Sequence, residues 1–274
     1  MRKFRTSDGL GLAYSSHGSG VPVLCLSGLT RTMADFDYVT PHMQNVRLIK
    51  MDYRGRGASD WDNNWRNYNL LIEARDVIEL LDHLELEKVA ILGTSRGGLL
   101  AMGLAFGAKD RLRGIALNDI GPEINPAGLA YIMEYLGKEP KVKDHLQLAR
   151  SLAKNLPGFT GVPLERWMEE AVKHYHKTNR GLALTYDPKL RDAVEEQGAQ
   201  AAPDLWPYFD AMEGLPLACI RGENSNLLTK ETFAEMQRRR PDMTAATAVG
   251  RGHIPFLDEP EAVAALQTWI GALE

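Results

Sequence analysis

One serine stands in a setting that would make it a nucleophile. The segment GTSRGG at positions 93–98 contains the spacing G-x-S-x-G, follows the apolar run at 89–92 and precedes a helical run that begins at Leu99. On a sharp turn from strand to helix, a serine hydroxyl projects above the edge of a sheet. The flanking glycines permit this turn and the close approach of helix and strand. The pattern therefore predicts that Ser95 is a catalytic nucleophile rather than part of a plain glycine-rich turn.

A serine nucleophile needs backbone N–H groups that stabilise the negative charge formed on the attacked carbonyl oxygen. Arg96 follows Ser95 at the start of the expected helix, so its N–H group is one candidate. The loop SGLT at 27–30 follows the apolar run at 21–26 and supplies the second candidate, the N–H group of Leu29. We expect Leu29 and Arg96 to form the oxyanion hole.

His253 is the predicted general base. It follows a weak strand at 244–249 and precedes Pro255 and the last helical run, in a loop close to the end of the sequence. A histidine at this place along the chain can serve a serine nucleophile that lies far away in the sequence. The other six histidines have less claim, because they lie in turns or on polar helical faces. They stand at positions 17, 42, 83, 145, 174 and 176.

The elements that must position these residues alternate along the chain. Near-continuous apolar runs predict strands buried on both faces, and they lie at 21–26, 46–51, 89–92, 114–117, 217–220 and 244–249. Helical periodicity fits residues 70–84, 99–106, 229–240 and 261–273. A hairpin of residues 2–5 and 12–16 is expected at the edge of the sheet. The alternation predicts a mostly parallel, doubly wound α/β sheet.

The region from 121 to 212 breaks this alternation. It is helical in character, contains no convincing strand and is interrupted by proline and glycine. We predict a helical cap at 121–212, inserted after the sixth strand of the chain, on a core formed by residues 1–120 and 213–274. A cap over the strand ends would close a ligand pocket. Trp167, Tyr175 and Trp206 are the candidate pocket residues.

Six segments together resemble the α/β-hydrolase family, and especially its capped esterase and lactonase branch. They are CLSGLTR, DYRGRGASD, LGTSRGG, ALNDIGPE, RGENSN and GRGHIPFLDEP, in the family's order and spacing from end to end. The resemblance implies a serine hydrolase without cofactor or metal, which acts on a small-molecule ester or lactone through an acyl-enzyme. Carbon–carbon bond or enol-lactone hydrolysis on the same frame, and a weakly catalytic ligand receptor, are the alternatives.

The acid of the triad is the point of departure from the family pattern. The resemblance puts an Asp at the last position of RGENSN, where this sequence has Asn226. An Asn would favour the wrong tautomer of His253, and the corresponding exchange in another serine hydrolase lowers kcat roughly 10⁴-fold. Three interpretations stay open. Asn226 replaces a natural Asp and disables the enzyme; Asp119 supplies the acid, as in some family members, instead of only capping the turn before Gly121; or the acid is Glu223 or absent.

Composition excludes several other classes. The net charge of −4 gives no support for nucleic-acid binding. No run approaches 18 apolar residues and no signal-peptide pattern follows Met1, so neither a membrane span nor secretion is expected. Cys25 and Cys219 lie in strand-like runs, which suits buried free thiols and offers no metal-binding spacing. These features predict a cytoplasmic protein without a metal ion.

Overall fold

The apolar runs form one eight-stranded sheet with the order β1-β2-β4-β3-β5-β6-β9-β10. The computed structural model describes residues 1–199 and 203–273; residues 200–202 of the expected cap and residue 274 lie outside the described residues. β2 pairs antiparallel with β1 and with β4, and the other neighbours are parallel. The strands are β1 Arg2–Arg5, β2 Gly11–His17, β3 Val21–Leu26, β4 Val46–Met51, β5 Val89–Thr94, β6 Leu112–Asn118, β9 Leu217–Gly222 and β10 Thr244–Ala248.

Helices cover both faces of this sheet because its strands are apolar on both sides. Within β3, Leu24 and Leu26 belong to one hydrophobic cluster, whereas Val23 and Cys25 belong to the other, as the alternation of side chains along a strand requires. The first cluster includes side chains of α1 Leu70–His83, α2 Arg96–Gly107, α7 Trp206–Asp210 and α8 Lys230–Arg239; the second includes side chains of η1 Met33–Asp37 and α9 Pro260–Gly271. Three further 3-10 turns are η2 Thr40–His42, η3 Trp65–Asn67 and η4 Lys109–Arg111. The predicted doubly wound α/β sheet is confirmed.

α1 and α8 begin at side chains that cap them. The Asn69 side chain accepts a hydrogen bond from the Ile72 N–H group at the start of α1, and Thr229 does the same for Thr232 at the start of α8. α2 has no such side-chain cap. It begins at Arg96, three residues before the start that the sequence predicts. No helix of the described ranges is long and apolar enough to cross a membrane.

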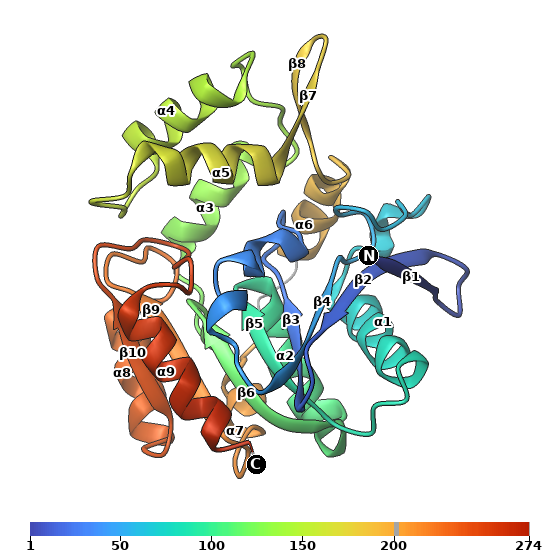
Figure 1. Ribbon diagram of the computed structural model, residues 1–274, viewed down its shortest axis with the longest axis vertical. Coiled ribbons are helices and arrows are strands. Elements are labelled where there is room, and N and C mark those ends of the chain that lie inside the picture. Colours follow the sequence, from blue (N-terminus) through green and yellow to red (C-terminus); the bar gives the residue numbers. More distant parts are fainter. Residues whose placement is uncertain (200–202, 274) are drawn as a thin grey trace.

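Residues 126–198, between β6 and β9, form a separate layer of helices and a hairpin. Figure 1 shows α4, α5 and the hairpin at the top of the molecule, with α3 leading to them from the sheet. The elements are α3 Pro126–Tyr135, α4 His145–Asn155, α5 Leu164–His174, β7 Tyr175–Thr178, β8 Gly181–Leu184 and α6 Leu190–Gly198. The expectation of no strand in this region was wrong: β7 and β8 are four residues each and pair only with each other, so they leave little periodicity to detect.

The loop after β4 is fixed by buried charges. The Arg54 guanidinium donates two hydrogen bonds of 2.7 Å to Asp76 of α1, and neither side chain is exposed. Two residues after Arg54, Arg56 lies 2.8 Å from the Glu73 carboxylate. This carboxylate also accepts a hydrogen bond of 2.6 Å from Arg96. Glu73 therefore links the loop after β4 to the residue that follows Ser95.

Removal of the Arg54 charge should destabilise the whole fold. In Arg54→Met the carboxylates of Asp76 and Asp62 lose their shared partner, and only the partly exposed Arg75 stays beside Asp76. Removal of one partner from a buried ion pair costs about 3–5 kcal/mol. Glu196→Gln is the matched control, because its pair with Arg66 is exposed and worth less than about 1 kcal/mol. Urea denaturation measures both; equal midpoints for the two variants would contradict this account.

Candidate active site

Ser95 lies on a strained turn between β5 and α2. Its backbone has φ 51° and ψ −114°, a region that non-glycine residues rarely adopt. The neighbouring glycines explain how the turn fits: a Cβ atom on Gly93 would lie 2.5 Å from the Gly97 carbonyl oxygen, and one on Gly97 would lie 2.0 Å from that of Leu26. The helix thus approaches the strands more closely than any side chain would permit.

His253 joins the nucleophile to an acid. Its Nε2 lies 3.0 Å from the Ser95 hydroxyl oxygen, and its Nδ1 lies 2.7 Å from the Asp119 carboxylate. An ionised carboxylate only accepts hydrogen bonds, so Nδ1 carries the proton and donates a hydrogen bond to Asp119. Nε2 is then left without a proton, ready to accept the hydrogen bond of the serine hydroxyl. These two contacts bring together Ser95, His253 and Asp119 in the arrangement of a nucleophile, a base and an acid.

Asp119 is completely buried and held by other groups besides His253. Its Oδ1 accepts a hydrogen bond of 2.8 Å from the Gly222 N–H group, and its Oδ2 accepts one of 2.6 Å from the Ser225 hydroxyl. Both donors belong to the end of β9 and the loop after it. The neighbouring strand therefore orients the acid instead of supplying it.

The structure brings Asp119, and not position 226, to His253, so its geometry favours the second of the three open interpretations of the acid. Among the described residues, the Asn226 side chain makes no hydrogen bond with His253; it lies in the wall of a cavity. The carboxylate beside His253 comes from the residue directly after β6, and the loop after β9 contributes the Ser225 hydroxyl that holds it. Glu223 is excluded from the same place, since its carboxylate accepts a hydrogen bond from the Gly250 N–H group.

The two expected oxyanion donors lie beside the nucleophile. Leu29 follows Gly28, at which a Cβ atom would lie 3.8 Å from the Cβ atom of Ser95. Arg96 is the first residue of α2. Within residues 1–199 and 203–273, neither the Leu29 nor the Arg96 N–H group donates to a protein acceptor. Both groups are therefore free for a bound oxygen atom.

A cavity of about 380 Å³ lies between the loops at the strand ends and the helices above them. His253, Asn226 and Arg31 contribute to its wall from below. The apolar part of the wall comes from Ile132, Leu148, Leu152, Leu156 and Trp167, and tyrosines stand at 131, 135, 175 and 186. Two of the three expected pocket residues, Trp167 and Tyr175, thus line this cavity.

Trp206 does not line the cavity, so this third expectation was wrong. Its indole N–H group donates a hydrogen bond of 2.8 Å to Glu123. Its ring meets that of Phe209 edge to face and lies under the Arg239 guanidinium. α7, which carries Trp206, packs against α2 at the sheet. The sequence around Trp206 contains no feature that distinguishes a helix of the cap from a helix that packs on the core.

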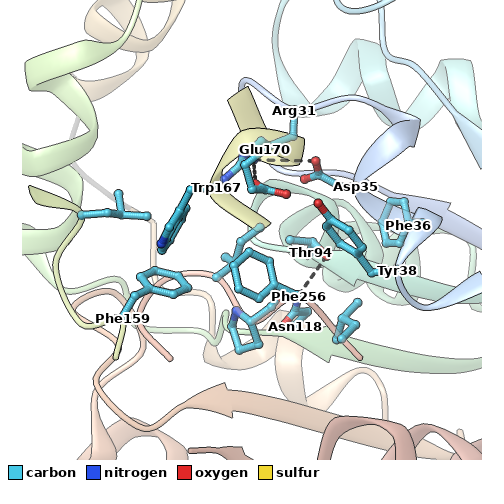
Figure 2. A pocket seen from close by; sticks show the side chains of 14 residues that line it. Arg31, Asp35, Phe36, Tyr38, Thr94, Asn118, Phe159, Trp167, Glu170 and Phe256 are labelled. Atoms are coloured by element: carbon cyan, nitrogen blue, oxygen red, sulfur yellow. Dashed lines mark hydrogen bonds and ion pairs between the residues drawn. The ribbon is translucent and has the colours of Figure 1, made fainter. Parts of the chain in front are cut away.

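A second cavity, of only about 20 Å³, lies next to the triad, between Thr94, Asn118 and Phe256 (Figure 2). This is room for about one water molecule. The Oδ1 atom of Asn118 is buried there without a partner among the described residues. Within residues 1–199 and 203–273, no group of three or more His, Cys, Asp or Glu side chains has the arrangement of a metal site.

Comparisons with known proteins identify the family of this chain. The sequence model of the alpha/beta hydrolase family matches residues 23–266. The chain is 35% identical over 260 residues to a 3-hydroxybutyrate-oligomer hydrolase of Cupriavidus necator, which covers 91% of this chain and 88% of that protein. It is 25% identical over 248 residues to a 2-(acetamidomethylene)succinate hydrolase of Mesorhizobium japonicum, with 89% and 85% covered.

Among solved structures, an alpha/beta hydrolase of Novosphingobium aromaticivorans superposes with a TM-score of 0.92 at 34% identity, covering 99% of this chain and 97% of that one. The chain therefore belongs to the alpha/beta hydrolase family.

The position of the acid can be tested with two reciprocal exchanges. We expect Asp119→Asn to lower kcat for p-nitrophenyl butyrate by roughly 10⁴-fold, because the amide would favour the wrong tautomer of His253. Asn226→Asp makes the opposite chemical change and should alter kcat by less than about tenfold, since position 226 does not face Nδ1.

A gain of about a hundredfold or more in Asn226→Asp, on the scale of tautomer defects, would return the acid to position 226. Nearly full activity in Asp119→Asn would also contradict the proposal that Asp119 is the acid. Circular dichroism spectra of both variants establish that the fold is retained.

Proposed function

We propose that this protein is a serine hydrolase that cleaves a small to medium carboxylic ester through a covalent acyl-enzyme. The observation that carries the proposal is the pair of contacts at His253, 3.0 Å to the Ser95 hydroxyl and 2.7 Å to the Asp119 carboxylate. The name of the relative at 35% identity adds support, because oligomers of a hydroxy acid are joined by ester bonds. A lactone, which is a cyclic ester, would react by the same steps.

In the first half-reaction, Ser95 Oγ attacks the ester carbonyl carbon while its proton passes to His253 Nε2. The Asp119 carboxylate stabilises the imidazolium through the Nδ1–H group. The N–H groups of Leu29 and Arg96 donate to the oxyanion of the tetrahedral intermediate. The intermediate collapses, the alcohol leaves with the proton from Nε2, and the acyl group stays on Oγ.

In the second half-reaction, a water molecule attacks the acyl-enzyme. His253 Nε2 takes a proton from this water, the same two N–H groups stabilise the second oxyanion, and the acid leaves as Ser95 recovers its proton. Every proton transfer in this cycle uses the same nitrogen atom, His253 Nε2.

The alternative of a weakly catalytic ligand receptor has less support, because it depended on an Asn in place of the acid.

The segment 121–212 acts in this proposal as a cap that selects the substrate. α3, α4 and α5 provide most of the apolar wall above His253, so the acyl or alcohol chain would lie against them. α7 is assigned to the core because of its packing on α2. A wall of aliphatic and aromatic side chains suits a substrate that is apolar over most of its length.

Ser95→Ala should lower kcat for p-nitrophenyl butyrate by on the order of 10⁴- to 10⁶-fold, because no other group can form the acyl-enzyme. Ser19→Ala, at an exposed serine far from the site, is the matched control and should keep full activity. Mass spectrometry after treatment with a p-nitrophenyl phosphonate should find one adduct, on Ser95. Steady turnover by Ser95→Ala, or labelling at another residue, would reject the mechanism.

A further inference from the structure

Arg31 is a cation placed beside the nucleophile. It follows the oxyanion loop, and its N–H group closes a turn onto the Gly28 carbonyl oxygen. The point that a Cβ atom on Gly28 would occupy lies 3.3 Å from Arg31 Cγ and 3.8 Å from Ser95 Cβ. The side chain therefore starts next to Ser95, and it lines the cavity that His253 also lines. The ester mechanism makes no use of this charge.

One edge of the Arg31 guanidinium is fixed by the protein. Nη1 donates a hydrogen bond of 2.8 Å to Glu170 and lies 3.8 Å from Asp35. Figure 2 shows Arg31 beside Glu170 of α5, with Asp35 next to this pair. Within the part of the chain that the structure describes, Nε and Nη2 donate to no protein acceptor, and 26% of the side chain is accessible. The guanidinium thus has donors left over.

The groups behind Arg31 hold it in place and balance its charge. His174 lies 3.0 Å from Asp35 and 3.4 Å from Glu170, and all three side chains are nearly buried. Burial alone would raise the pKa of Glu170, but the neighbouring His174 and Arg31 cations hold that pKa below its ordinary value. For His174, burial and Arg31 act to lower the pKa, yet Asp35 and Glu170 raise it above its usual value. Two carboxylates thus flank Arg31 and His174, and their contacts orient the guanidinium.

The cavity wall near Arg31 adds further donors. Tyr135 and Tyr175 line the same cavity, and among the described residues neither hydroxyl has a hydrogen-bond partner. Burial raises the pKa of Tyr135 to about 12, with Arg31 close enough to act in the opposite direction. Neutral hydroxyls and an arginine with unused N–H groups form a donor set in an otherwise apolar wall. A planar anion with two acceptor oxygens, a carboxylate, matches this set best.

We propose that Arg31 is a specificity-determining residue that binds a free carboxylate of the substrate. The preferred substrates are then esters that carry a carboxylate a few carbon atoms from the scissile carbonyl, such as hemiesters of dicarboxylic acids or short oligomers of hydroxy acids. The inference rests on the proposed ester hydrolysis for its chemistry. Glu170 is a positioning residue, because it acts through Arg31.

The experiment compares acidic esters with neutral esters that have the same number of acyl carbon atoms. Monoethyl succinate, glutarate and adipate are set against ethyl butanoate, pentanoate and hexanoate, and the released ethanol gives kcat/KM for each. We expect the unmodified protein to favour at least one hemiester over its neutral counterpart. In Arg31→Gln this preference should fall by roughly 10- to 100-fold, the value of charge-assisted hydrogen bonds. Arg150→Gln, at an exposed arginine of α4, should leave the preference unchanged.

A second measurement needs no turnover. Calorimetry of glutarate binding to Ser95→Ala, with and without Arg31→Gln, should show weaker binding by the same factor when Arg31 is missing. The proposal is overturned if the unmodified protein prefers no hemiester, or if Arg31→Gln slows acidic and neutral esters equally, which would make Arg31 only a tie between core and cap. Rapid hydrolysis of neutral esters in either case leaves the proposed function standing. Loss of that function would appear instead as a lack of turnover of both ester series while glutarate binding is retained.

Discussion

The close contact between α2 and the strands beneath it is the constraint on which the site depends. At Gly97 the helix backbone comes so near the Leu26 carbonyl that a single added carbon atom would collide with it. This contact forces the turn at Ser95 into its unusual backbone conformation and points the hydroxyl away from the sheet. It also brings the end of β3, with Gly28 and Leu29, to the side of the serine. Ser95 and the proposed oxyanion donors are thus placed by one packing requirement, and the strain at Ser95 is offset by the burial of α2.

Charges buried around this contact keep it rigid. Glu73 of α1 joins Arg96, next to the nucleophile, to Arg56 in the loop after β4. On the other side, Glu170 of α5 reaches Arg31 near the oxyanion loop. Buried ion pairs of this kind contribute little net stability, because desolvation offsets the attraction, but they fix direction strongly. The same contacts that orient the core loops therefore also set how the overlying helices sit above the nucleophile.

The acid shows how a local sequence motif and a long-range contact can disagree. The segment RGENSN has the form to which the family resemblance assigns the acid, yet in this structure it contributes the Ser225 hydroxyl, which donates to Asp119. Asp119 was one of the open alternatives, and its signal was its place directly after a buried strand. Sequence alone did not choose between it and Asn226. That choice depends on which strand end faces the histidine, and a motif of six residues carries no information on that.

Sequence by itself determined the elements whose cause is local. The turn at Ser95, the buried strands and the capped helices of the core follow from glycine spacing, apolar periodicity and N-cap side chains a few residues apart. Tertiary structure decided what depends on residues far apart: the acid that meets His253, the return of Trp206 to the core, and the arginine that Glu170 orients beside the nucleophile. The physical reason is that strand order and helix packing bring together groups separated by more than a hundred residues. The spacing of residues within one short segment carries no information on which distant segment that segment will contact.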